Sequence, residues 1–328
     1  MSGGSVVPIE EIGNVRPPAF VRLPDLATVF QRRAERLEAL ASGHILEGWL
    51  RFVAALSRAQ HAALRRLPSG TLPGPEELAA AREAQRPALE SEHWRDDPTW
   101  SAALDAVLAE MAAVEKPAAA EAARRHLAGL DAEARAALVA RYLSYELGKD
   151  ERGAAPYVAA ALQLYWTRMA ALLDADAVGL RDDKSACPVC GGAPVASVVS
   201  GAQGDSRPLR YVCCGLCQSQ WNEVRIKCTA CGSTQGIAYH HVDQGGEAAA
   251  EAAPAAGGEK PDRSAEGPTV RAETCDGCKT YLKILYRERD VAADPIADDL
   301  ATLELDILTS EAGYHRVAPN PFLILGED

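Results

Sequence analysis

The sequence predicts a multidomain α+β protein. An N-terminal all-α helical domain is expected first, followed by two small metal-knuckle modules of the rubredoxin-like or zinc-ribbon kind and a C-terminal helix. Two observations predict this order. Apolar residues recur at helical spacing up to about residue 180, whereas turn-rich segments alternate with short strand-like runs beyond it. All nine cysteines also lie between residues 187 and 278, so the thiols belong to the second half alone.

The N-terminal half is expected to be an irregular arm over residues 1–20 and an α-helical domain over residues 21–180. Apolar spacing predicts helices within 24–66 and over 76–85, 98–114, 118–128, 131–147 and 155–173. The last of these segments is apolar nearly all round, which indicates a buried central helix.

The second half is expected to divide into three parts. Residues 181–243 would hold the first rubredoxin-like module and the start of the second, and residues 269–328 the remainder of the second module with a C-terminal helix over 295–312. Residues 244–268 lack large apolar side chains, which predicts a disordered loop insert. On the C-terminal helix we expect Asp298, Asp299 and Asp306 to form a solvated charged face.

Eight cysteines form four CxxC pairs. Two residues between thiols let both sulfurs of a tight turn reach one ion, and two such turns supply a closed four-thiolate site. The expected metal ligands are therefore Cys187, Cys190, Cys214, Cys217, Cys228, Cys231, Cys275 and Cys278. Joining the first two pairs in one site and the last two in another costs less chain entropy than an interleaved arrangement, which stays open. Cys213 competes with Cys214, but the two-residue gap to Cys217 favours Cys214 as the ligand and leaves Cys213 as a small apolar core residue.

The spacing does not decide which metal binds. Four thiolates suit zinc, which would be structural, and equally a single iron, which would allow one-electron chemistry. His240 and His241 fall on an expected strand, and we expect one buried and one solvated imidazole because the thiol set is complete without them. No catalytic residues are assigned, since the chain carries no phosphate-binding loop, no Ser/His/Asp signature and no paired-carboxylate motif.

Charge and the N-terminal pattern bear on partners and location. The formal net charge of −12 argues against nucleic acid, which requires a basic face. The chain begins without a signal-peptide pattern and contains no run of 18 apolar residues, so we expect no membrane insertion. Paired thiols in a leaderless chain predict the reducing cytoplasm.

With these motifs in hand, the sequence resembles the formate dehydrogenase accessory protein (FdhE) family. The resemblance is carried by RRAERLEALA (32–41), RFVAALSRAQ (51–60), APYVAAALQLYW (155–166), CPVCGGAPVAS (187–197), RYVCCGLCQSQWNEVRIKC (210–228), CDGCKTYLKILY (275–286), ADDLATLELDILTSEAGYHR (297–316) and NPFL (320–323). It implies a cytoplasmic maturation factor, not an enzyme, that binds the catalytic subunit of a respiratory formate dehydrogenase before export. It also implies that the eight paired cysteines bind iron in two rubredoxin-like sites, with zinc as the alternative.

Two other classes of protein stay open. One is a zinc-ribbon nucleic-acid-binding or transcription factor, which the acidic charge opposes. The other is an oxidoreductase that uses its iron as an electron relay, for which the sequence has no second cofactor motif. The sequence also leaves open whether two copies form a homodimer and which formate dehydrogenase is the client.

Overall fold

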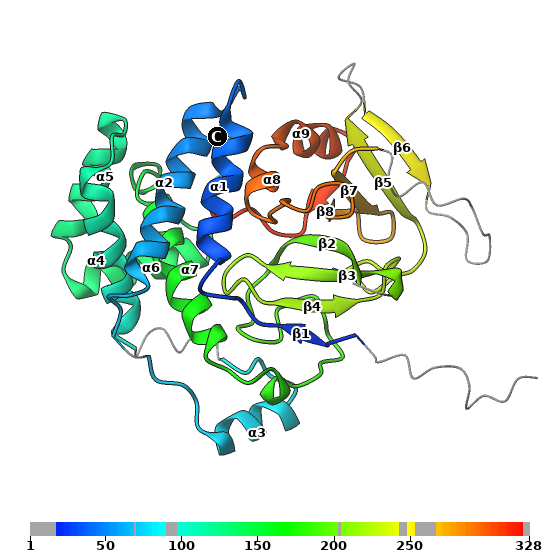
Figure 1. Ribbon diagram of the computed structural model, residues 1–328, viewed down its shortest axis with the longest axis horizontal. Helices are drawn as coiled ribbons and strands as arrows, with labels where there is room; N and C mark the ends of the chain where they lie inside the picture. Colours follow the sequence, from blue (N-terminus) through cyan, green and yellow to red (C-terminus); the bar gives the residue numbers. More distant parts are fainter. Residues whose placement is uncertain are drawn as a thin grey trace, which may run out of the picture.

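The computed structural model describes residues 18–68, 70–89, 97–202, 205–242, 248–252 and 267–323. A helical part and a sheet-rich part lie side by side (Figure 1). The predicted α+β class, with helices first and strands second, is confirmed. None of the described helices combines the length and the apolar run that a membrane crossing requires.

The helical part contains α1 (Val29–Ala41), α2 (Glu47–Ala63), α3 (Pro75–Glu83), α4 (Thr99–Glu110), α5 (Ala118–Gly129), α6 (Ala132–Leu143) and α7 (Ala155–Ala171). Short 3-10 turns follow at Met111–Ala113, Lys149–Glu151 and Ala175–Ala177. The chain reverses between α1 and α2 at Gly43, whose φ of +73° is in the left-handed region that glycine tolerates best. Nearly every residue of α7 is buried, so the predicted central helix is confirmed.

The strands form one nine-stranded sheet. Its members are β1 (Val21–Arg22), β2 (Pro194–Ala202), β3 (Asp205–Cys214), β4 (Gln220–Glu223), β5 (Ile237–Val242), β6 (Ala248–Ala252), β7 (Val270–Cys275), β8 (Thr280–Tyr286) and β9 (His315–Arg316). The order is β1-β4-β3-β2-β8-β7-β5-β6, with β9 also beside β8. Strands β2 and β8 pair in parallel, so the hairpins of the first and second modules continue into each other. The two modules are therefore halves of a single sheet.

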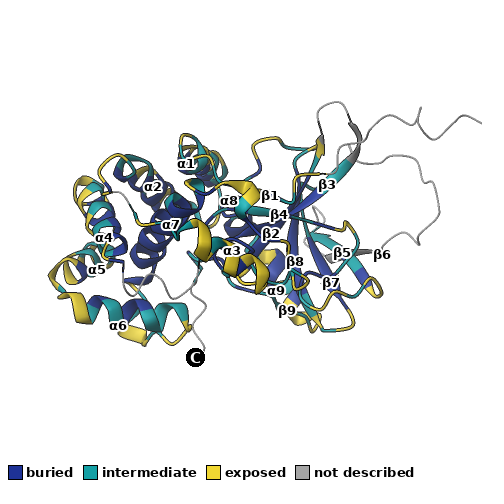
Figure 2. Cartoon of the chain, turned by 90° about the horizontal axis from the view of Figure 1, so that it is seen from below, coloured by how far each residue is buried: buried dark blue, intermediate teal, exposed yellow. Residues whose placement is uncertain are grey.

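The N-terminal residues before α1 also belong to the sheet, which the sequence did not indicate. Val21 pairs with Trp221 in β4, and the Tyr211 hydroxyl donates to the Ala19 carbonyl oxygen at 2.9 Å. The helical part and the first module share one buried core, which includes Leu162 of α7 and Val198 of β2. Figure 2 shows the buried residues running from α7 into the strands.

The C-terminal segment differs from the expectation. In place of one helix over 295–312, the structure has α8 (Ala297–Leu300) and α9 (Leu303–Glu311). The expected solvated carboxylate face is wrong, because Asp298, Asp299 and Asp306 are only 3%, 0% and 8% exposed. Burial is tolerated here because each carboxylate meets a cation from a distant element, namely Arg36, Arg316 or Lys283.

Two predicted segments fall mainly outside the described residues. Residues 1–17 of the predicted arm are not described. Residues 243–247 and 253–266, which make up most of the predicted insert over 244–268, are not described either. Within that insert, Ala248–Ala252 form β6, which pairs antiparallel with β5.

Candidate metal centres

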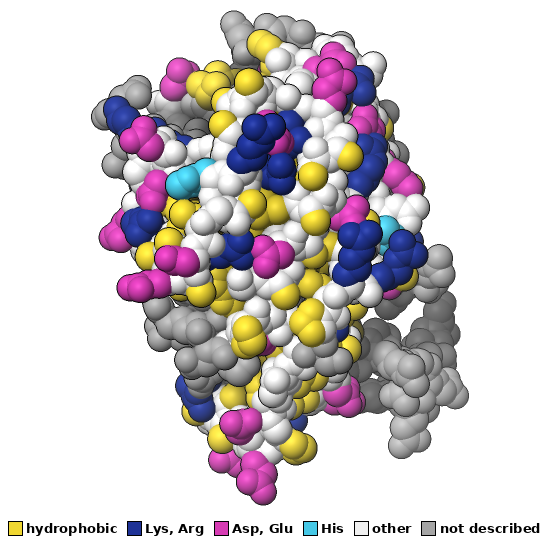
Figure 3. Space-filling model, turned by 90° about the vertical axis from the view of Figure 1, so that its left-hand side faces the viewer, with side chains coloured by type: hydrophobic (Ala, Val, Ile, Leu, Met, Phe, Trp, Pro, Cys, Tyr) yellow, Lys and Arg dark blue, Asp and Glu magenta, His cyan; other side chains and the backbone are white. Residues whose placement is uncertain are grey.

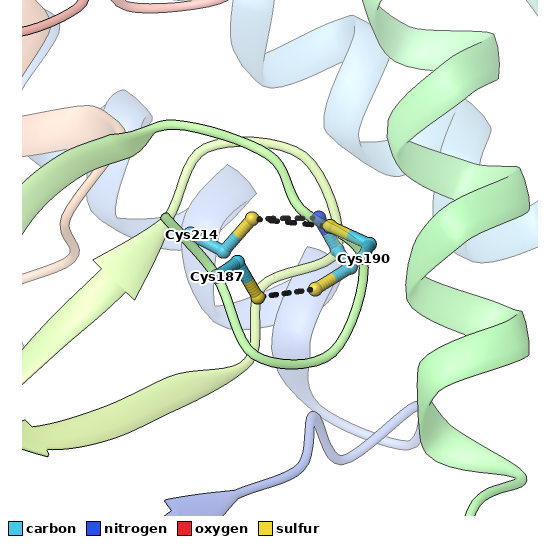
Figure 4. Close-up of side chains that lie close together, drawn as sticks. Cys187, Cys190 and Cys214 are labelled. Atoms are coloured by element: carbon cyan, nitrogen blue, oxygen red, sulfur yellow. Dashed lines mark hydrogen bonds between the residues drawn. The ribbon is translucent and has the colours of Figure 1, made fainter. Parts of the chain in front are cut away.

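The first cysteine cluster is built from two turns at the ends of strands. The CPVC turn precedes β2, and the CGLC turn joins β3 to β4. In the first turn the Gly191 amide donates to the Cys187 carbonyl oxygen at 2.9 Å, and the φ of Gly191 is +75°. This closed turn directs Cys187 and Cys190 toward Cys214 of the second turn (Figure 4).

The sulfur positions in both clusters suit a shared ion. In the first, Cys187 Sγ lies 3.6 Å from Cys217 Sγ, and Cys190 Sγ lies 3.6 Å from Cys214 Sγ. In the second, the Cys228–Cys278 and Cys231–Cys275 separations are both 3.7 Å. All four sulfurs of each cluster lie within 4.8 Å of one another.

Elementary geometry decides between an ion and disulfides. A tetrahedral site with metal–sulfur bonds of about 2.3 Å has sulfur–sulfur edges of about 3.8 Å. A disulfide bond would require about 2.05 Å. The eight sulfurs are therefore spaced as four-thiolate donor sets, and the predicted grouping of neighbouring pairs is confirmed.

Cys213 stands apart from both clusters, as expected. It lies on β3 opposite Ala196 of β2 and is buried. Burial raises the pKa of the Cys213 thiol to about 12, so it remains protonated and is a poor metal ligand. The prediction that Cys213 is a small apolar core residue is confirmed.

The first cluster is fully buried, and its charge state depends on the hydrogen bonds among its thiols. Burial raises the pKa of Cys187, and hydrogen bonding with Cys187 raises that of Cys190. Burial also acts to raise the pKa of Cys214, but the hydrogen bonds it accepts from the other three cysteines lower it well below the ordinary range. The Leu216 amide donates to the same sulfur at 3.3 Å. The Cys214 sulfur is thus favoured as a thiolate, whereas Cys187 and Cys190 favour the neutral thiol, and a bound metal would promote their ionisation.

The same cluster joins the sheet to the helical part. The Ala88 and Leu89 amides donate to the carbonyl oxygens of Pro188 and Val189, inside the CPVC turn, at 3.1 and 2.7 Å. From α7, the Gln163 side-chain amide donates to the Gly215 carbonyl oxygen at 2.7 Å. The conformation of these two turns therefore determines how the helices dock on the sheet.

The second cluster is more open. Cys228 and Cys275 are buried, whereas Cys278 is half-buried and Cys231 is exposed. Although burial acts to raise the pKa of Cys278, hydrogen bonds from Thr280 and then from neighbouring cysteines lower it to about 7. This cluster thus has an edge in contact with water.

Two histidines near the second cluster do not join it. His240 Nε2 lies 3.0 Å from Thr274 Oγ1, and both His240 and His241 are half-buried. The expected split into one buried and one solvated imidazole is wrong. Neither histidine belongs to the four-sulfur groups.

Sequence reasoning did not identify an ion pair that links the two modules. Arg210 of β3 meets Glu273 of β7 at 2.8 Å, with both side chains buried. Arg210 also donates to the hydroxyl oxygens of Ser197 and Thr229 at 3.0 and 2.9 Å. A charged residue within the strand RYVCC was the only signal, and it could not have named Glu273 as the partner.

The difference in exposure predicts the order of metal loss. We expect a chelator to remove metal from the purified protein in two phases, with the second cluster emptied first because Cys231 is exposed. A chromogenic chelator followed by absorbance measures both phases. Cys231→Ser should abolish the fast phase and retain the slow one. Loss of both phases in that variant, or retention of both, would contradict the prediction.

The fold and the donor sets together define a class: an α-helical domain docked on a sheet that carries two four-cysteine clusters. Models of three segments of one family match the chain in order. These are "FdhE, N-terminal" over residues 18–181, "FdhE, central domain" over residues 186–225 and "FdhE, C-terminal domain" over residues 226–323. The chain belongs to the FdhE family.

Individual relatives agree with this membership. A "Protein FdhE homolog" of Rhizobium meliloti (strain 1021) is 36% identical over 98% of this chain and 99% of its own length. One from Edwardsiella ictaluri is 37% identical over 96% of this chain and 94% of its own. The crystal structure of the FdhE protein from Pseudomonas aeruginosa superposes with a TM-score of 0.79 at 35% identity, covering 94% of this chain and all of that one.

Proposed function

We propose that this protein is a maturation factor for a respiratory formate dehydrogenase, and that it binds the catalytic subunit in the cytoplasm before export. The observation that carries the proposal is the presence of two four-cysteine clusters in a chain that belongs to the FdhE family. Each cluster offers four protein ligands, which fills a tetrahedral ion and leaves no position for a substrate. Such sites support structure or electron transfer, and we assign the protein no catalysis of its own.

We propose iron as the metal, held by the eight paired cysteines in two rubredoxin-like sites, with zinc as the alternative. Iron in a four-thiolate site supplies one-electron chemistry when bound. The chain's own contribution differs between the sites: the buried cluster fixes the docking of helices on sheet, and the open cluster presents a sulfur edge at the surface. A redox effect on the client is therefore assigned to the second cluster.

Elemental analysis tests the metal. The protein is to be purified anaerobically, and we expect two iron ions per chain, one for each cluster, with a thiolate-to-iron band in the visible spectrum. Two zinc ions in a colourless protein would exclude the redox role, and the two sites would then serve only to stabilise the structure.

Restoration of activity tests the maturation role. Extracts of cells lacking their FdhE protein are to be supplemented with the metal-loaded chain, and formate-dependent dye reduction is measured. We expect activity to appear with the natural chain and with Cys213→Ser, but not with Cys231→Ser, because only the latter removes a ligand. An extract that stays inactive with the natural chain would refute the proposal.

A nucleic-acid-binding function is the weaker candidate. The net charge is −12, and the end face of the helical part mixes Lys and Arg with Asp and Glu (Figure 3). Such a face lacks the basic field that phosphate binding needs.

A further inference from the structure

A groove lies where all three family segments meet. It has a volume of about 750 Å³, within the range of ligand-binding clefts. Its walls come from the start of α1, from β1 and the turn after Cys217, and from the loop between β8 and α8. Figure 1 shows α1 between α2 and the sheet, which places the groove along this junction.

Three arginines in the walls have no carboxylate partner among the described residues. The Arg22 guanidinium lies over the Tyr211 ring at 3.7 Å, and Arg287 Nε donates to the Ala293 carbonyl oxygen at 3.0 Å. Arg32 is exposed on α1. Each therefore retains N–H donors that can meet an anion in the groove.

The carboxylates of the same walls each accept hydrogen bonds from neighbouring groups. Asp25 accepts from the Ala27 amide and the Thr28 hydroxyl, and Glu35 accepts from Gln31. Asp294 is paired with Arg33 at 3.3 Å. The walls carry four arginines against three carboxylates, which is a small positive excess in a chain whose net charge is −12.

An apolar contact point accompanies these cations. Val291, in the loop wall, is 88% exposed, and Leu23 and Val29 of the opposite wall are half-buried. A ligand that is complementary to the whole groove carries carboxylates that pair with the arginines and an apolar side chain that packs against Val291, Leu23 and Val29.

We propose that the groove binds an extended acidic segment of the client polypeptide, with its carboxylates at Arg22, Arg32 and Arg287 and an apolar side chain against Val291. The identity of the partner as a dehydrogenase catalytic subunit rests on the function proposed above. Gln218 lines the groove directly after Cys217, so the bound segment lies beside the buried metal cluster.

Peptide binding to the full, metal-loaded chain tests the site. The probe is a short fluorescein-labelled peptide in which glutamate alternates with leucine, and anisotropy reports its affinity. Arg32→Glu is expected to weaken binding about tenfold, because it replaces a charge-assisted contact with a repulsion. Val291→Asp should weaken it as well, and the fold tolerates this change because the Val291 side chain is exposed.

Matched controls separate the groove from the overall charge. Arg65→Glu makes the same charge change at an exposed position near the end of α2, outside the groove, and should bind the peptide like the natural chain. Equal weakening by both arginine variants would overturn the proposal. Tighter binding of an oligothymidylate of equal charge than of the peptide would overturn it too.

The maturation assay then separates this proposal from the proposed function. We expect Arg32→Glu to retain both metals and to lose most of its ability to restore formate dehydrogenase activity, while Arg65→Glu retains it. If Arg32→Glu restores full activity, the groove assignment fails and the maturation role stands. If the natural chain restores nothing but still binds the peptide, the maturation role fails and the groove remains a peptide site.

Discussion

Replacing Cys190 by serine is expected to remove one metal ion per chain and to unfold the first module together with its contact to the helices. Cys190 is fully buried, its sulfur lies 3.6 Å from Cys214 Sγ, and it accepts a hydrogen bond from the Gly192 amide at 3.4 Å. A structural four-cysteine site contributes on the order of 10 kcal/mol of folding free energy, which is comparable with the whole stability of a domain.

Three measurements check this expectation. Elemental analysis should give one metal per chain, thermal unfolding should begin at a much lower temperature, and limited proteolysis should cleave between α7 and β2. Cys213→Ser is the matched control, because it makes the same chemical change at a buried cysteine outside both clusters. It should retain both metals and lose about 1–3 kcal/mol from burying a hydroxyl. Metal loss in Cys213→Ser with retention in Cys190→Ser would show that the ligand assignment is wrong.

The cysteine clusters could be predicted because the spacing of two cysteines within one short turn is visible in the sequence itself. A CxxC turn brings its two thiols together whatever the rest of the chain does, and only the choice of partner turn needs long-range structure. Neighbouring pairs were favoured by loop entropy, and the structure has that grouping. The burial of α7 was predictable for the same reason, since its apolar residues surround a single helix.

What the sequence did not show depends on residues far apart in the chain. The parallel pairing of β2 with β8 merges the two modules, and no local pattern encodes that neighbour. The carboxylates of α8 were expected in solvent because charged helix faces usually are solvated. They are buried because Arg36, some 262 residues earlier, binds Asp298 through two N–H groups. The sequence shows charged side chains, but only the fold brings the opposite charge to them.

Removing the Lys283 cation is expected to destabilise the protein by about 3–5 kcal/mol, the usual cost of breaking a buried ion pair by removing one partner. Lys283 Nζ lies 2.6 Å from Asp306 Oδ2 and 3.3 Å from Asp299 Oδ1. It also donates to the carbonyl oxygens of Asp299 and Thr302, both at 2.9 Å. In Lys283→Met, Arg316 remains as the only ion-pair partner of both carboxylates among the described residues.

Chemical denaturation with both metals bound measures the loss in Lys283→Met, and Lys279→Met serves as control because its ion pair with Asp276 is exposed. The control should leave the midpoint nearly unchanged.

Dependence on pH provides a second check. Burial acts to raise the pKa of Asp299, but Arg316 and Lys283 together lower it below the ordinary value. A carboxyl with a lowered folded-state pKa stabilises the fold above its unfolded pKa of about 3.9, and that contribution is lost as pH falls. The natural chain should therefore lose this contribution on acidification and the variant should lose less, so the difference between them narrows. A difference that is constant with pH would mean that Lys283 acts through packing and not through its charge.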